Sequence, residues 1–486
     1  MDRPHAKRAR IRTGGSLALA ACAALVAAPA GASGAGDAGL GAALPAWSAV
    51  PFAGMLLSIA LLPLLAGRFW RRHYPEVAAG WAAALAVPLL AAHGPAAFAA
   101  LVHTVIADYL PFVVLLGALY TIGGGVLIRG TLHGSPPVNA VIIATGTVLA
   151  SVIGTTGATV LLIRPLLRAN RRRTRRAHTV VFFIVLVANV GGCLTPLGDP
   201  PLFLGFLHGV PFFWTLRLWR EMAFTSVLLL AAYLLLDLWH WRREDPAARE
   251  HPEGRRERLR LEGAHNLAFL LGALAAVVLS GVWHPGSVSV LGVERGIEGL
   301  VRDVALVALA VGSWLTTPHR VRHENEHEWE PIREVAVLFA GIFVTMVPVL
   351  AMLGAGERGA LGSVVREVRT PALFFWVTGG LSSVLDNAPT YLTSLSAALG
   401  RLHPGLPERE AISSVIAGAP QYLQAIATGA VFMGANTYIG NAPNLLARSI
   451  AESAGVKMPS FFGYVLLYTV PFLLPVFALV TLVFFA

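Results

Sequence analysis

Charged residues are scarce in this sequence. Only 13% of its 486 residues are Asp, Glu, Lys or Arg, whereas 56% are hydrophobic. Soluble globular domains carry about 25% charged residues, so the composition excludes an ordinary soluble fold. Apolar stretches such as 47–67, 335–353 and 461–486 reach the roughly 20 residues needed to cross a bilayer. The sequence therefore predicts an all-α polytopic membrane protein with about 10–12 transmembrane helices, whose main partner is the lipid bilayer.

Cysteine and lysine are also rare. Cys22 and Cys193 both lie in apolar runs, so no disulfide framework or thiolate metal site is indicated. Lysine occurs only at Lys7 and Lys457, so the net charge of +10 comes almost entirely from arginine. The arginines cluster in short loops between apolar segments, as the positive-inside rule describes for cytoplasmic loops. We therefore expect no nucleic-acid partner.

Residues 1–36 have the pattern of a signal peptide. A basic start, MDRPHAKRARIR, is followed by the apolar run SLALAACAALVAA and by small residues in GASGAG. A retained first span is the alternative, but the apolar run is short for crossing a bilayer. We expect this segment to be cleaved.

The arginine-rich loops predict the topology. GRFWRRH, RANRRRTRRAH, the polar loop 241–264 and PHRVRHENEHEWE all fall on the cytoplasmic side if the spans between them alternate. This alternation requires the segment near 139–167 to enter and leave on the same face, as a re-entrant hairpin. Irregular backbone at that depth is tolerated only where protein or water covers it.

Two polar motifs recur in the same order in both halves of the chain. LASVIGTTGATVLLIRPLL aligns without gaps to LSSVLDNAPTYLTSLSAAL, and GGCLTPLGDPP aligns to MGANTYIGNAP. Chance similarity between Ala/Leu-rich segments is the alternative, but the ordered recurrence argues against it. We expect repeats at 37–240 and 265–486, the second with a hairpin near 372–400. The loop charges give the repeats inverted topology, which is typical of secondary transporters.

The motif GDPP predicts an interrupted helix. Pro200 and Pro201 lack N–H donors, and Gly198 permits an unusual turn. The carbonyls that lose their partners can bind a hard cation, which prefers carbonyl, hydroxyl and carboxylate oxygens. A kinked helix capped by an aspartate is the alternative. The candidate cation- and proton-binding residues from both motif pairs are Thr155, Thr156, Thr195, Gly198, Asp199, Asp386, Asn387, Thr437, Asn441 and Asn444.

Two acidic side chains in apolar surroundings suggest proton coupling. Intramembrane acids usually mark ion pathways, and a proton and a cation compete for the same carboxylate oxygens. If only the neutralised site of Asp199 and Asp386 can reorient, this competition is sufficient for antiport. We expect Na⁺ and H⁺ as transported or coupling ions, and no cofactor.

These motifs resemble the ion transporter superfamily, which includes citrate and divalent-anion sodium symporters and D-type sodium/proton antiporters. GDPP and GNAPN look like its Gly-Thr-Pro-Pro-Asn signature, and LDNAPT looks like the hairpin tip of the antiporter branch. The carboxylate symporters carry Ser-Asn-Thr at both tips, where this chain has GTT and DNA. The resemblance implies a scaffold domain, a transport domain with elevator-type alternating access, a homodimer and the bacterial inner membrane.

Three other functions compete with a cation antiporter. A citrate or dicarboxylate symporter coupled to sodium, proton or a metal ion would need cationic partners, for which Arg164 and Arg448 are candidates; the alternative is that both snorkel to the interface. A zinc enzyme is suggested by HENEH at 323–327, which matches H-E-x-x-H. That motif lies in a charged loop, expected to be solvated, with no obvious third ligand, so we expect neither an enzyme nor a zinc site. A non-transporting receptor or structural protein is the third alternative.

Overall fold

The structure is a computed structural model that describes residues 41–130, 132–246, 260–325 and 327–486. The expected signal peptide at 1–36 and positions 247–259 of the expected loop 241–264 lie outside the described residues. The described chain is built almost entirely of helices, as the composition predicts.

The helices of the first half, in chain order, are α3 (Val50–Leu65), α4 (Gly67–His103), α5 (Leu110–Gly123), α6 (Pro136–Ile153), α7 (Thr155–Ala169), α8 (Ala177–Leu186), α9 (Pro200–His208) and α10 (Trp219–Trp241). Those of the second half are α12 (Asn266–Val282), α13 (Ile297–Thr316), α14 (His319–Glu324), α15 (Glu330–Gly354), α16 (Gly362–Glu367), α17 (Pro371–Ser382), α18 (Asn387–Leu402), α19 (Glu408–Gly418), α20 (Pro420–Met433), α21 (Ala442–Ser453), α22 (Phe461–Tyr464) and α23 (Leu474–Val480).

Short 3₁₀ and π segments join these helices: η1 (Ala46–Ala49), η2 (Thr104–Tyr109), η3 (Val190–Leu194), η4 (Phe212–Leu218), η5 (Gly356–Arg358), η6 (Gly434–Asn436), η7 (Val465–Leu473) and η8 (Thr481–Phe485). The strands form two small antiparallel ribbons. One pairs β1 (Leu127–Arg129) with β2 (Arg260–Glu262), and the other pairs β3 (Ser287–Val290) with β4 (Val293–Gly296).

Eight helices in the described part of the chain are long and apolar enough to cross a membrane, or nine if the bent pair α19–α20 counts as one span. The polytopic all-α class is thus confirmed. The expected number of 10–12 exceeds this count. Two shorter apolar helices, α12 and α17, account for part of the difference.

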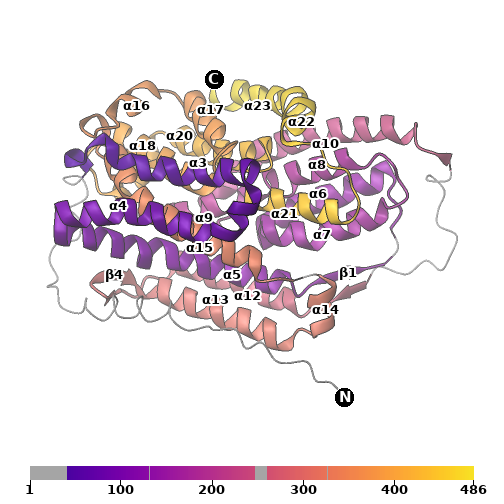
Figure 1. The fold of residues 1–486 in the computed structure, drawn as a ribbon, viewed down its shortest axis with the longest axis horizontal. Helices are drawn as coiled ribbons and strands as arrows, with labels where there is room; N and C mark the ends of the chain where they lie inside the picture. Colours follow the sequence, from indigo (N-terminus) through magenta and orange to yellow (C-terminus); the bar gives the residue numbers. More distant parts are fainter. Residues whose placement is uncertain (1–40, 131, 247–259, 326) are drawn as a thin grey trace, which may run out of the picture.

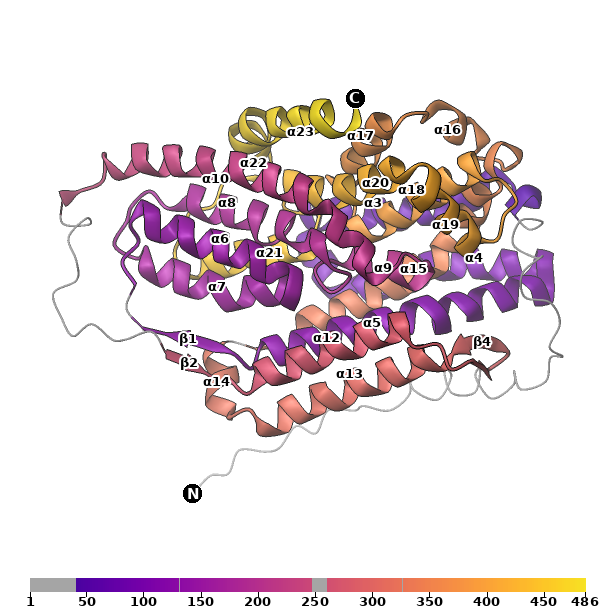
Figure 2. The ribbon, with the colours of Figure 1, turned by 180° about the vertical axis from the view of Figure 1, so that it is seen from behind.

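The helices form two groups. α3, α4, α5, α12, α13 and α15 lie side by side along one layer, and the remaining long helices lie on the other (Figures 1 and 2). In this second group α8 occupies the centre, and nine of its ten residues are buried. A helix that is apolar on every side belongs in a protein core, so the burial agrees with the sequence of α8.

Two helix pairs occupy the expected hairpin positions. α6 and α7 meet at Gly154, whose φ of +81° favours glycine. α17 and α18 are separated by the four residues 383–386. The breaks therefore fall at the motifs GTT and DNA, as expected; that the pairs are re-entrant remains a prediction.

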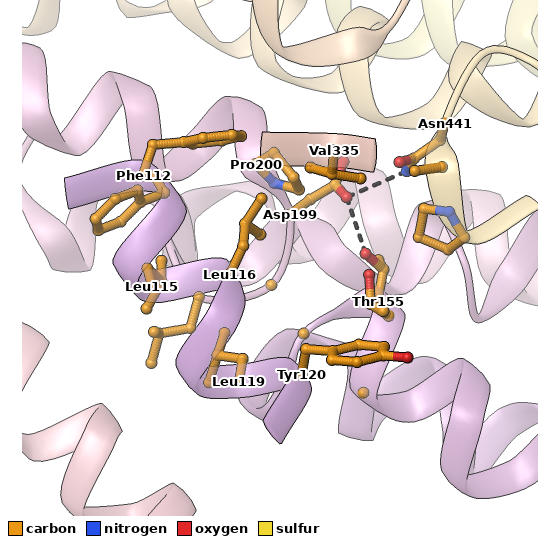
Figure 3. A pocket seen from close by; sticks show the side chains of 18 of the residues that line it. Phe112, Leu115, Leu116, Leu119, Tyr120, Thr155, Asp199, Pro200, Val335 and Asn441 are labelled. Atoms are coloured by element: carbon orange, nitrogen blue, oxygen red, sulfur yellow. Dashed lines mark hydrogen bonds between the residues drawn. The ribbon is translucent and has the colours of Figure 1, made fainter. Parts of the chain in front are cut away.

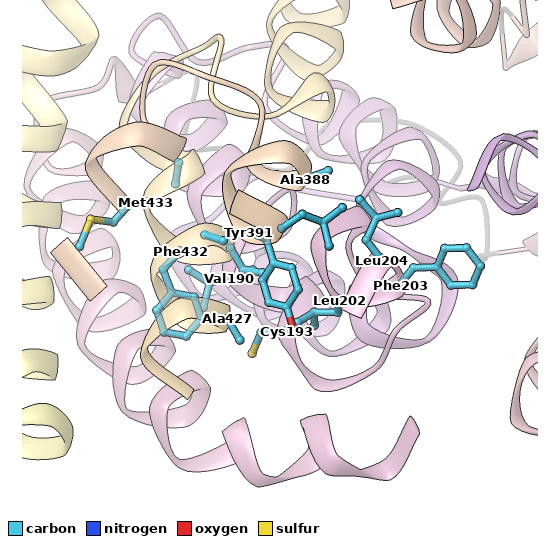
Figure 4. Close-up of a cluster of buried hydrophobic side chains, with 14 of the residues drawn as sticks. Val190, Cys193, Leu202, Phe203, Leu204, Ala388, Tyr391, Ala427, Phe432 and Met433 are labelled. Carbon is cyan, nitrogen blue, oxygen red and sulfur yellow. The ribbon is translucent and has the colours of Figure 1, made fainter. Parts of the chain in front are cut away.

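The second helix pair packs against the broken helix in the first half of the chain, which consists of α8, η3 and α9. Figure 4 shows Tyr391 of α18 beside Leu202 of α9 and Cys193 of η3. The fit is close, because a Cβ on Gly205 would lie 2.4 Å from the Tyr391 hydroxyl oxygen. Elements of both halves of the chain thus share one core in the second group of helices.

Candidate functional site

Two helices of the second group are broken: one consists of α8, η3 and α9, and the other of α20, η6 and α21. Equivalent hydrogen bonds hold both of them. The Thr195 hydroxyl donates to the Ser151 carbonyl at 2.5 Å, and the Thr437 hydroxyl donates to the Ser383 carbonyl at 2.5 Å. These residues occupy aligned positions in the two repeated motifs. Each broken helix is therefore fastened to the first arm of its own helix pair.

Glycine is required where each broken segment turns back on itself. A Cβ on Gly198 would lie 2.1 Å from the Gly192 carbonyl oxygen. A Cβ on Gly440 would lie 2.5 Å from the Ser382 carbonyl oxygen and 2.6 Å from that of Gly434. Glycine at position 198 therefore lets this backbone segment approach the Gly192 carbonyl closely, which a residue with a Cβ would prevent.

Asp199 lies where these elements meet. It precedes α9 in extended conformation and its side chain is 1% exposed. Its Oδ1 atom accepts hydrogen bonds from the Thr155 hydroxyl at 3.0 Å and the Asn441 amide at 3.2 Å (Figure 3). Its Oδ2 atom accepts from the Asn387 amide at 2.5 Å. Four expected site residues, from both helix pairs and both broken helices, thus meet at one carboxylate.

The alternative role of Asp199 as a helix cap is wrong. Its side chain forms no hydrogen bond with the first turn of α9. The physical reason is that Pro200 and Pro201 fill the first two positions of that helix and have no N–H to donate. The Asp199 carboxylate therefore depends on side chains from other elements.

Asp386, in contrast, does cap a helix. Its Oδ1 atom accepts a hydrogen bond of 3.1 Å from the Ala388 N–H at the start of α18. The side chain is half-buried and contributes to the same cavity as Asp199. Capping leaves lone pairs on the carboxylate for a second ligand.

Asn189 completes the amide network, and sequence reasoning missed it. Its amide donates to Asn444 Oδ1 at 2.7 Å, and its Oδ1 atom accepts from Asn441 at 3.3 Å. Asn444 in turn donates to the carbonyls of Gly434 at 2.8 Å and Thr437 at 2.9 Å. Carbonyls expected to await a cation in the second broken helix therefore already have a donor. The available signal was a lone amide in the apolar run before GGCLTP.

The Asn387 carbonyl oxygen is in a different situation. Its Oδ1 atom is buried, and no hydrogen-bond partner for it occurs among the described residues. An unpartnered buried acceptor costs about 1–3 kcal/mol. This oxygen belongs to the residue that contacts Asp199 and is suited to serve as a ligand of a cation.

A cavity of about 100 Å³ opens beside Asp199 (Figure 3). It lies between α5 and α15 of one helix group and the broken segments of the other. One wall is apolar, with Phe112, Leu115, Leu116 and Leu119 from α5, and these lining residues carried no polar signal in the sequence. The side chains with polar groups that line the cavity are Tyr120, Thr155, Thr156, Asp199, Asp386 and Asn441.

The candidate anion-binding arginines do not line this cavity. Arg164 donates to the backbone carbonyl of Asn325. Arg448 pairs with Glu452 at 2.9 Å, and its guanidinium lies 4.4 Å from the ring centroid of Tyr438. Among the described lining residues there is no Arg, Lys or His.

The HENEH segment is more buried than a solvated loop. His327 stacks on Tyr120 with ring centroids 4.7 Å apart, and the Asn325 amide donates to the carbonyls of Gly124 and Val126. Burial lowers the pKa of His327 to about 4, and the charge of Arg322 adds to this effect. Glu326 of the motif lies outside the described residues, and no cluster of three metal-binding side chains occurs in the part described.

The long apolar helices define a multi-pass membrane protein, and a cavity lined by two carboxylates lies between its two helix groups. A model of the family described as "Putative citrate transport" matches residues 41–485, and the chain belongs to this family. An uncharacterized transporter of Mycobacterium tuberculosis is 26% identical over 340 residues, covering 67% of this chain and 72% of the relative. The 46 kDa membrane protein of Mycobacterium leprae is 25% identical over 332 residues, with the same coverage. The P protein of Homo sapiens is 29% identical over 171 residues, 33% of this chain and 19% of the P protein.

Proposed function

We propose that this protein exchanges a small inorganic cation, with sodium the expected ion, for protons. One observation carries the proposal: two carboxylates and no basic side chain line the described cavity between the two helix groups. A cation is attracted to such a site, whereas an anion is repelled.

The contacts of Asp199 support competition between a cation and a proton. Its carboxylate accepts three hydrogen bonds from neutral donors, so the ionised form is solvated without a counter-charge. A cation can bind at this carboxylate with the Thr155 hydroxyl, which lines the cavity, and the buried Asn387 carbonyl as further oxygen ligands. A proton on the carboxylate removes the charge that attracts the cation, so the two occupants exclude each other.

The place of the cavity supports elevator-type alternating access. Its apolar wall belongs to α5 and α15, and its polar wall belongs to the helix pairs and broken helices. If the second group moves along this apolar wall, it carries Asp199 and Asp386 together. The apolar wall of α5 and α15 carries no charge that would hold an ion at an intermediate position.

Citrate symport is the second candidate, and the family match favours it. In a cavity lined by carboxylates, citrate would need accompanying sodium ions, protons or a metal ion to neutralise its charge. In this function Asp199 and Asp386 would bind the accompanying cations. The same residues thus serve both candidates, and only the transported solute differs.

Flux measurements in proteoliposomes distinguish the two. A sodium gradient is imposed while lumenal pH is recorded, and uptake of labelled citrate is measured in parallel, with and without sodium or Mg²⁺. Antiport predicts sodium-driven proton movement that is lost in Asp199→Asn and Asp386→Asn and kept in Glu357→Gln, an exposed acid remote from the cavity lining. Citrate uptake that survives both aspartate changes, without sodium-driven proton movement, contradicts the proposal.

A further inference from the structure

A second cavity lies at the start of α10, apart from the Asp199 site. Its volume is about 340 Å³, and it lies between the end of η4, α20 and the C-terminal η8. The lining residues are Arg217, Trp219, Arg220, Glu221, Gln424 and Phe484. None of them lines the cavity beside Asp199.

Two arginines of this cavity are available to an external anion. Arg217 and Arg220 are both exposed, and within the described ranges neither forms an ion pair with an acidic side chain. The Arg220 guanidinium lies 5.7 Å from the ring centroid of Trp219. Guanidinium groups match the planar, two-oxygen face of a phosphate group, so the pair is suited to a phosphate ester.

Glu221 adds a hydrogen-bond acceptor whose charge is opposite to that of the two arginines. Its side chain is only 4% exposed, and its Oε2 atom has no hydrogen-bond partner in the described part of the chain. A buried carboxylate oxygen without a donor is costly, because its water is lost and nothing replaces it. Glu221 lines the same cavity as the arginines, so a ligand with both a phosphate and an N–H donor satisfies both.

The surroundings of the cavity are apolar and exposed. Phe213 and Leu216, which precede the lining residue Trp219 in the chain, are exposed, and so are Leu482 and Val483, which precede the lining residue Phe484. Side chains of this kind on a membrane protein face acyl chains, and a tryptophan near charged groups is typical of the membrane interface. The cavity also lies at the end of α10 opposite Trp241, which leads into an arginine-rich loop, so the loop charges place it toward the outer leaflet.

We propose that this cavity binds the headgroup of a phosphatidylethanolamine lipid. The phosphate lies on Arg217 and Arg220, the primary ammonium donates to Glu221, and the acyl chains follow the exposed apolar side chains. Phosphatidylglycerol has the phosphate but no ammonium. Phosphatidylcholine has a quaternary ammonium without an N–H donor, so Glu221 distinguishes the three lipids.

Native mass spectrometry of the purified, delipidated full-length protein tests this proposal. Phosphatidylethanolamine, phosphatidylglycerol and phosphatidylcholine with identical acyl chains are titrated separately. We expect phosphatidylethanolamine to bind at least tenfold more tightly than either of the others. Glu221→Gln should reduce this preference to less than threefold and leave phosphatidylglycerol binding in place. Arg217→Gln with Arg220→Gln should weaken all three, whereas Arg72→Gln, another exposed arginine, should change none.

Three results overturn the proposal: equal affinity for the three lipids, tighter binding of phosphatidylglycerol, or a preference that Glu221→Gln leaves unchanged. If Glu221→Gln does not fold, the lipid preference of the native protein and the weaker binding to the double variant Arg217→Gln with Arg220→Gln still decide the question. The measurement needs no transport, so its outcome is independent of which ion or solute the Asp199 site carries.

Discussion

The Asn387 amide donates a hydrogen bond of 2.5 Å to the Oδ2 atom of Asp199, although the two residues are 188 positions apart in the chain. Asp199 belongs to the broken helix in the first half of the chain, and Asn387 belongs to the helix pair in the second half. The contact therefore joins the two halves directly at the carboxylate that we propose as the ion site.

Replacing Asn387 with Ala should move transport to higher pH. A hydrogen bond to a charged group contributes about 1.5–3 kcal/mol, and its loss favours the protonated carboxylate by about one to two pH units. Half-maximal sodium-driven proton flux should therefore require a more alkaline medium by about that amount, as measured in proteoliposomes over a pH series. Thr156→Val is the matched control, because Thr156 lines the cavity but has no hydrogen bond to Asp199 among those described. An unchanged pH profile in Asn387→Ala would show that this contact does not tune the site.

Gly198→Ala and Gly440→Ala should both destabilise the protein. The added Cβ would lie 2.1 Å and 2.5 Å, respectively, from backbone carbonyl oxygens, and overpacking of this kind costs about 1–3 kcal/mol or more. Thermal unfolding in detergent should show a lower Tm for each variant. Gly380→Ala is the control, because Gly380 lies exposed in α17 with nothing within 4 Å of the new Cβ. A Tm equal to that of this control would contradict the close backbone approach.

Acid should destabilise the protein partly through His327. Burial lowers the pKa of His327 to about 4, below the value of about 6.5 for an unfolded histidine. Between these values the unfolded chain binds more protons, so the stability contribution is present above pH 6.5 and is lost as the pH falls toward 4. His327→Phe keeps a ring beside Tyr120 and removes this titration, so its Tm should fall less between pH 6.5 and 4.5. The exposed His319→Gln should behave like the native protein, and equal falls in all three would contradict the assignment.

Asp237 anchors a buried ionic network in the second group of helices, and its replacement by Asn should be strongly destabilising. Its carboxylate accepts from Arg173, from His178 at 2.8 Å, from Tyr233 at 3.0 Å and from Asn139 at 3.3 Å. Breaking a buried ion pair costs about 3–5 kcal/mol, because the partner charge stays buried without compensation. Tm in detergent should drop sharply in Asp237→Asn and recover in part when Arg173→Gln is added. A double variant no more stable than the single one would show that the Arg173 charge is not the cause.

Paired motifs in the sequence indicated which side chains lie together. The motifs put Thr155, Asn387 and Asn441 at equivalent breaks, and the structure brings all three to Asp199. Spacing alone could not distinguish a side chain that binds an ion from one that donates a hydrogen bond to a backbone carbonyl. Thr195, Thr437 and Asn444 were expected to bind a cation, yet their side chains donate to carbonyls within their own half of the chain. The sequence also could not predict the apolar wall from α5 and α15, because an apolar residue that faces a cavity has the same chemistry as one that faces lipid.

Arg164→Gln and Arg448→Gln should leave transport nearly unchanged, whichever solute moves. Neither side chain lines the cavity, and Arg448 is engaged by Glu452 and Tyr438 at a partly exposed position. Because both arginines lie outside the proposed ion site, the change in sodium-driven proton flux and in citrate uptake should be at most about twofold. Proteoliposomes containing equal amounts of each variant provide the comparison, with Asp199→Asn as the reference for a complete loss. A tenfold loss of citrate uptake in either arginine variant, with proton movement intact, would instead identify that arginine as an anion ligand. The cavity beside Asp199 would then be only part of the solute path.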